Sequence, residues 1–116
     1  MSKVARVRLQ PAALARLDDI YRYGVSRWGE AQAGRYIRDL FDLFDRIAAG
    51  AVLARPIPSA LGVEGFVARQ GRHFVYWRTL PGGDVGIVTV LHERMHQIDR
   101  LRGDLGLEPP PDTTGS

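Results

Sequence analysis

The sequence predicts an α+β domain. An N-terminal strand and an antiparallel helical hairpin precede a three-stranded antiparallel meander, and all the strands form one sheet. Three observations lead to this class. Apolar residues recur every three to four positions across 11–49, as in amphipathic helices. Residues 65–91 form short β-rich runs separated by turn residues. The 116 residues have room for only one hydrophobic core.

The first predicted element is a strand over residues 3–9, KVARVRL, in which apolar and basic residues alternate. Arg6 and Arg8 would share its outer face, as suits the edge of a sheet. Pro11 then opens a helix, where its fixed φ and missing N–H cost nothing. Gly29 is a natural stop for this helix. One apolar stripe is predicted along it from the spacing of Leu14, Leu17, Tyr21, Val25 and Trp28.

A second helix is predicted from Glu30 to Ala49, with Gly50 ending it. The short turn at Gly29 predicts that the two helices form an antiparallel hairpin. The apolar residues of the second helix step by 4, 3, 4 and 3 positions, which is the packing seam of paired helices. They are Ala33, Ile37, Leu40, Phe44 and Ile47. Residues 51–63 contain two prolines and a glycine, and they predict a loop.

Three strands are predicted next, over residues 65–70, 73–80 and 85–91. Turn residues at 70–72 and 81–84 separate them. The last strand is almost wholly apolar, so we expect it to be central and buried on both faces. Residues 93–102 predict a short helix that completes a single domain over 1–102. The acidic, Pro-rich segment 103–116 has too few apolar groups to repay ordering entropy, and it predicts a flexible tail.

Composition narrows the function classes. The chain has no cysteine, which excludes a disulfide framework, a thiolate zinc site and a Cys nucleophile. Its net charge is +3, and 15 of its 16 basic residues are Arg. An Arg-rich surface suits acidic protein segments or nucleic acid, although the codons of a GC-rich genome also favour Arg. No window resembles a signal peptide or a spanning helix, so we expect a cytoplasmic protein without membrane contact.

Two catalytic interpretations concern the second half of the chain. The run from His92 to His96 fits the H-E-x-x-H zinc pattern, but no third ligand follows at a usual spacing. We therefore predict no metal and no cofactor. Metal-free RNA cleavage needs a base, an acid and cations to stabilise the phosphate. The chain offers these residue types without a diagnostic spacing, in His73, His92, Glu93, Arg69, Arg72 and Arg78.

Several segments together resemble the ParE branch of the RelE/ParE toxin superfamily. The first segment contains Leu17, Ile20, Tyr21 and Tyr23, and it is followed by the run from Trp28 to Ala33 and by Tyr36. Later, HFVYWR (His73–Arg78) is similar to the family's H-V-x-[FY]-[YW]-R strand, and VTVLHERMH (Val88–His96) is similar to its L-H-x-x-M segment. The order and spacing agree over about residues 3–98. The superfamily fold, a strand and a helix hairpin on an antiparallel sheet, agrees with the layout predicted above.

The resemblance implies the toxin of a bacterial type II toxin–antitoxin system, which causes growth arrest and stabilises a plasmid or chromosome. ParE-type toxins inhibit DNA gyrase and are neutralised by a ParD-type antitoxin, so nucleic acid would be reached only indirectly. RelE-type relatives instead cut messenger RNA in the ribosome with a basic set that includes lysines. This chain has no Lys after Lys3. A ribosome-dependent endonuclease built on the His, Glu and Arg set above remains the alternative function.

We predict separate surfaces for target and antitoxin. The gyrase-facing end is expected just after the last strand, at Arg94, Met95 and His96. Attraction between a basic domain and an acidic segment would speed binding of the antitoxin. We expect the antitoxin to bind the Arg-bearing sheet face and the helix hairpin, at Arg6, Arg8, Trp28, Tyr36, Arg69, Arg72 and Arg78. The sequence does not choose between a partner strand at the sheet edge and a partner helix on the hairpin.

Overall fold

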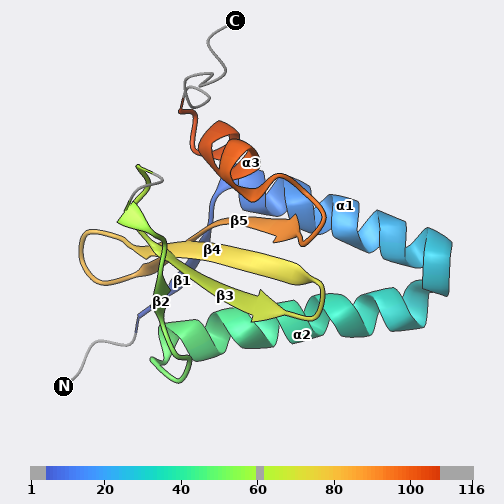
Figure 1. Ribbon diagram of the computed structural model, residues 1–116. Helices are drawn as coiled ribbons and strands as arrows, with labels where there is room; N and C mark the ends of the chain where they lie inside the picture. Colours follow the sequence, from blue (N-terminus) through green and yellow to red (C-terminus); the bar gives the residue numbers. More distant parts are fainter. Residues whose placement is uncertain (1–4, 60–61, 108–116) are drawn as a thin grey trace, which may run out of the picture.

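The computed structural model describes residues 5–59 and 62–107. Figure 1 shows two long helices joined by a tight turn and lying along a twisted sheet. In chain order the elements are β1 (Val7–Leu9), α1 (Pro11–Trp28), α2 (Glu30–Ala48), β2 (Arg55–Pro56), β3 (Phe66–Gln70), β4 (His73–Thr79), β5 (Val85–His92) and α3 (Gln97–Asp104). The predicted α+β class, helix hairpin and antiparallel meander are confirmed.

The sheet has the strand order β1-β5-β4-β3-β2. The strand β1 pairs parallel with β5, whereas all other neighbours pair antiparallel. The expectation that the first strand lies at a sheet edge is therefore confirmed, although β1 spans only three residues. The prediction of an unbroken loop over 51–63 is wrong at one point. Arg55 and Pro56 pair with Val67 and Phe66 as the opposite edge strand, where proline's missing N–H does no harm.

The helix hairpin forms as predicted, with Gly29 at a φ of 92° between the two helices. That conformation lies in the left-handed region, which favours glycine over residues with a Cβ atom. The predicted stripe on α1 is only partly correct. Leu17 is buried, but the residues that share the inward face with it are Ala13 and Gly24. An added Cβ at Gly24 would lie 3.0 Å from that of Ala33, so small residues bring the two helices close together.

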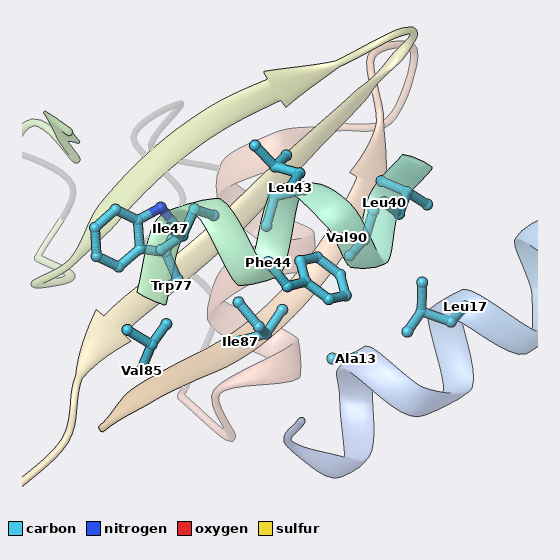
Figure 2. Close-up of a cluster of buried hydrophobic side chains, with 11 residues drawn as sticks. Ala13, Leu17, Leu40, Leu43, Phe44, Ile47, Trp77, Val85, Ile87 and Val90 are labelled. Atoms are coloured by element: carbon cyan, nitrogen blue, oxygen red, sulfur yellow. The ribbon is translucent and has the colours of Figure 1, made fainter. Parts of the chain in front are cut away.

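The main core lies between the hairpin and one face of the sheet. The predicted seam of α2 is confirmed, since Ala33, Leu40, Phe44 and Ile47 are buried. Figure 2 shows Leu40, Phe44 and Ile47 turned toward residues of β4 and β5, with Phe44 near Ile87. Trp77 faces this core and stacks on Phe66, with ring centroids 4.6 Å apart.

A second apolar cluster lies on the opposite face of the sheet. It joins Tyr76, Val88 and Leu91 to Leu101 of α3. Because both faces are covered, every residue of β5 from Val85 to Leu91 is buried, as the apolar run predicted. The pairing of β4 with β5 shifts by one residue at Tyr76 and Trp77. Because of this shift, β4 and β5 contribute side chains to the same cluster on each face of the sheet.

The last helix differs from its predicted position. We expected a helix over 93–102, but α3 spans Gln97–Asp104 and enters the segment predicted as tail. The reason is Asp104, whose carboxylate accepts hydrogen bonds from Arg16 of α1 at 3.1 Å and 3.2 Å and from Thr89 of β5 at 2.7 Å. Leu105 also packs against the second cluster. The rest of the predicted tail, from 108 to 116, lies outside the described residues. No described helix is both long and apolar enough to cross a membrane.

Candidate functional site

The sheet topology gathers polar side chains where β3 ends, β4 begins and β5 ends. His73 pairs with Gln70 on one side and with His92 on the other. Beyond the strands, the N–H of Glu93 donates to the carbonyl of Arg72 at 2.8 Å, which holds that residue at the same end of the sheet. We call the side chains gathered here the turn cluster: Tyr36, Arg69, Arg72, His73, His92 and Glu93.

Tyr36 connects α2 to this end of the sheet. Its hydroxyl donates to the carbonyl of Gln70 at 3.0 Å and lies 2.5 Å from Nδ1 of His73. The turn residue Gly71 has a φ of 58°, and an added Cβ would come within 2.8 Å of the Tyr36 oxygen. Only glycine satisfies both conditions, so Gly71 allows the Tyr36 hydroxyl to close over the turn.

The surroundings of His73 favour its neutral form. Burial lowers the pKa of His73 from 6.5 to about 4, and the neighbouring His92 adds to this effect, while Glu93 opposes it. The rings of His73 and His92 are 5.2 Å apart, edge to face. Burial also raises the pKa of Tyr36 above its usual value. At neutral pH, His73 can therefore accept a proton but cannot act as an imidazolium acid.

The turn cluster has two arginines, Arg69 and Arg72, but only one carboxylate, Glu93, and Arg69 is its closer partner. Arg69 Nη2 lies 2.5 Å from Glu93 Oε2, and the Arg69 Nε donates to the carbonyl of Gly71 at 3.0 Å. The Arg69 guanidinium also lies over the ring of Phe74, 5.4 Å from its centroid. Arg72 reaches the same carboxylate at only 3.9 Å, with 69% of its side chain exposed. Arg72 is therefore the member of the cluster best placed to meet an external anion.

The structure brings five of the six residues of the predicted nuclease set together. The exception is Arg78, which lies toward the other end of β4, opposite Gly86. Arg8 of β1 also pairs with Gly86, so Arg8 and Arg78 flank this glycine from neighbouring strands. Arg8 forms an ion pair with Asp84 at 3.0 Å.

The predicted antitoxin residues therefore fall into three places. Arg6, Arg8 and Arg78 lie toward one end of the sheet. Tyr36, Arg69 and Arg72 lie at the other end. Trp28 lies at the tip of the hairpin, where it contacts Tyr23 edge to face at 5.8 Å. The link between Tyr36 and His73 was missed from the sequence, because 37 positions separate the two residues and no local pattern joins them.

The predicted target residues Arg94, Met95 and His96 form the exposed connection from β5 to α3. The Arg94 N–H donates to Nδ1 of His92 at 3.1 Å, and Gln97 donates to the carbonyls of His92 and Met95. These bonds place the connection beside the turn cluster. His92 ends β5 and His96 is the N-cap of α3, whereas the zinc motif needs both histidines on one helix face. Within 5–59 and 62–107, no group of three His, Asp or Glu is positioned to hold a metal ion.

Comparison with known proteins identifies the family. The model of the ParE toxin of the type II toxin–antitoxin system parDE matches residues 7–97, which include every strand of the sheet. The chain belongs to the ParE toxin family. It is 36% identical to Toxin ParE1 of Mycobacterium tuberculosis over 97 residues, covering 83% of this chain and 96% of that protein. It is also 37% identical to Toxin ParE of Escherichia coli over 93 residues, or 80% of this chain and 89% of the other.

A solved structure confirms the fold. A chain from the chromosomal ParDE toxin–antitoxin system of P. aeruginosa superposes with a TM-score of 0.61 and 21% sequence identity. The match covers 78% of this chain and 98% of that chain. The resemblance to ParE toxins, carried by the hairpin segment and the two strand motifs, is therefore confirmed. The ParE-family matches extend over most of the folded residues of this protein.

Proposed function

We propose that this ParE-family chain inhibits DNA gyrase by direct protein–protein contact in the cytoplasm and is neutralised by a ParD-like antitoxin. Membership of the ParE toxin family over residues 7–97 carries this proposal. The chemistry of the turn cluster supports it. A nuclease needs free cations and a proton donor, but Arg69 is held by Glu93 and the His73 pKa of about 4 keeps that ring neutral.

The gyrase-facing surface is proposed at Arg94, Met95 and His96. All three side chains are exposed, and Met95 is an adaptable apolar group beside two basic ones. Hydrogen bonds from Gln97 hold the backbone of this connection, so the three side chains are presented on a supported turn. A preorganised surface loses less conformational entropy when it binds a partner.

The antitoxin is proposed to bind through its acidic groups. Residues 1–103 contain 16 basic and 10 acidic residues, which gives a charge of +6. Among the exposed arginines of the sheet, Arg8 and Arg78 lie toward one end and Arg72 lies at the other. An acidic segment that passes along the sheet would meet both groups of cations.

Expression of the chain in cells tests the proposal. Wild type should arrest growth and leave gyrase covalently bound to cleaved DNA, and co-expression of the cognate antitoxin should relieve both effects. The triple variant Arg94→Ala, Met95→Ala and His96→Ala should lose the effect on gyrase. The control Leu53→Ala, on an exposed loop away from this surface, should remain toxic. Continued growth of cells expressing wild type, without trapped gyrase, would overturn the proposal.

A second candidate function is a ribosome-dependent messenger RNA endonuclease. The observation that favours it is the gathering of Tyr36, His73, His92, Glu93 and Arg72 at one end of the sheet. A neutral His73 is a possible base for the 2′-hydroxyl, and Arg72 can contact the phosphate. Primer extension on cellular messages after induction separates the two functions. New 5′ ends that disappear in a His73→Ala variant would establish cleavage, and unchanged message ends would exclude it.

A further inference from the structure

The helix α1 carries an apolar stripe that the fold leaves uncovered. Leu14, Tyr21 and Trp28 have exposed fractions of 54%, 39% and 55%. They are spaced seven residues apart, so they lie on one face of the helix over about 21 Å. We call these three residues the α1 stripe. Phe41 of the neighbouring α2 adds a further large apolar side chain that is 42% exposed.

The α1 stripe is not needed by the core of the protein. The inward face of α1 consists of Ala13, Leu17 and Gly24, and it already packs against α2 and the sheet. Single exposed apolar residues are ordinary on protein surfaces, but several large ones on one face of a helix indicate an interaction surface. Tyr and Trp are also the residue types that most often dominate binding energy at interfaces.

The charges beside the stripe indicate what covers it. Two charged residues lie next to the central residue of the stripe, Tyr21. Asp18 is three positions before it, and Arg22 is the next residue after it. Their ion pair, at 3.2 Å, is solvent-exposed on both sides and weak. An acidic partner would therefore meet a repelling carboxylate for each guanidinium. A second copy of α1 running antiparallel, with the two Tyr21 residues facing each other, would place each Asp18 within one helical turn of the other copy's Arg22.

We propose that the α1 stripe is a two-fold interface with a second copy of this chain. Around a two-fold axis at Tyr21, the tyrosines of the two copies meet, and Leu14 of each copy meets Trp28 of the other. This is an isologous contact, in which one surface is complementary to itself. The seven-residue spacing is the one that keeps apolar side chains in register between two packed helices. The interface uses neither the turn cluster nor residues 94–96, so it stands independently of the proposed gyrase contact. It does include Trp28, so dimerisation would compete with an antitoxin bound at that residue.

Sedimentation equilibrium of the purified full chain tests the interface. Wild type should dimerise with increasing concentration, and Tyr21→Glu should raise the dimer dissociation constant by at least about thirtyfold, as the loss of a central aromatic contact does. The matched control Leu53→Glu introduces the same charge at an 80% exposed apolar residue and should dimerise like wild type. Circular dichroism of each variant verifies that the fold is retained. A monomeric wild type, or equal dissociation by Leu53→Glu, would overturn the proposal.

A mixing experiment tests the antiparallel arrangement. Asp18→Arg places two bases beside the stripe, and Arg22→Asp places two acids there. Each variant alone should dimerise at least about tenfold more weakly than wild type, whereas an equimolar mixture should form a heterodimer. A loss of stability within either variant could weaken its dimer, but it could not explain why dimerisation returns when the two variants are mixed. If the mixture stays monomeric, the arrangement is wrong. If Tyr21→Glu weakens antitoxin binding while the wild-type chain is a monomer, the stripe belongs to the antitoxin and the proposal fails.

Discussion

His73 lies half-buried between the hydroxyl of Tyr36 and the ring of His92. Burial, with a smaller contribution from His92, lowers its pKa and keeps the ring neutral. Its position could be predicted from the sequence, because H-F-V-Y-W-R is a strong strand signal. Its pKa could not, because the burial that lowers it comes from α2 and β5, which lie far away in the chain. The sequence therefore supplied the residue types of the turn cluster, and the packing of distant elements decided their chemistry.

The protonation of His73 predicts a pH effect on stability. The unfolded chain takes up the proton near pH 6.5, whereas the folded protein does so only at about 4. The free energy of unfolding should therefore fall as the pH is lowered through this interval. Urea denaturation at several pH values measures it for wild type and for His73→Gln. Because the two proteins differ only at residue 73, the variant should show the shallower fall in the free energy of unfolding. Equal slopes in the two proteins would contradict the assignment.

At the scale of elements, local patterns predicted the long helices and the central strand but not the short pieces. The seam of α2 is correct because four of its five apolar positions face the main core, and the fifth, Ala33, is buried where α1 approaches. On α1 the same kind of pattern selected Leu14, Tyr21 and Trp28, which are exposed. Periodicity places residues on one face of a helix, but it does not show whether that face meets the core of its own chain.

The two-residue strand β2 and the helix α3 were missed or misplaced for a related reason. Arg55 and Pro56 form a strand only because β3 offers an edge to them. The helix α3 extends to Asp104 because that carboxylate binds Arg16 and Thr89, which lie 88 and 15 positions away. Neither contact has a signal within a short window of sequence.

The Asp104 contact predicts a stability effect for α3. Asp104→Ala removes the partner of Arg16 and leaves the hydroxyl of Thr89, which is fully buried, without its acceptor. We expect a loss of about 1–3 kcal/mol in the free energy of unfolding. The exposed Asp42 of α2 supplies the control, since Asp42→Ala should change it by less than about 0.5 kcal/mol. Denaturant unfolding of both variants gives the comparison, and a neutral Asp104→Ala would show that α3 does not depend on this bond.

The close approach of α1 and α2 predicts opposite outcomes for two glycine substitutions. Gly34→Ala places a Cβ only 3.5 Å from the flexible end of Arg38, so it should stabilise the protein by about 0.5–1 kcal/mol through helix propensity. Gly24→Ala places its Cβ 3.0 Å from that of Ala33, so crowding should offset or reverse the gain. Thermal unfolding of both variants measures the difference. Equal stabilisation by the two changes would mean that the helices separate at no cost.

On the scale of the whole molecule, the exposed arginines of the sheet and the apolar α1 stripe lie in different places. Arginines occupy both ends of the sheet, while the α1 stripe lies on the hairpin. The turn cluster and the exposed residues 94–96 share one end, beside α3. The overall fold and the ParE family could be predicted from the sequence because they depend on many local signals. The arrangement of these surfaces could not, because it follows from how the strands pair.

Electrostatic attraction predicts how antitoxin binding depends on salt. Association with an acidic antitoxin should slow as ionic strength rises, because exposed charges are screened over shorter distances. Arg72→Ser should slow association further, since that side chain is 69% exposed and only weakly paired. The control that removes one positive charge elsewhere is Arg46→Ser, at an exposed residue of α2. Arg16→Ser would not serve, because the ion pair of Arg16 with Asp104 is largely buried. A salt-independent association rate would contradict an electrostatic role for the arginines.

The central claim, that this ParE-family chain acts on gyrase through protein contact, is tested most directly by DNA supercoiling with purified gyrase and the purified chain. We predict that supercoiling is inhibited in the absence of ribosomes and restored when the cognate antitoxin is added. The variant that replaces Arg94, Met95 and His96 with alanine should leave supercoiling intact. Full supercoiling activity at every concentration of a folded wild-type chain would contradict the claim.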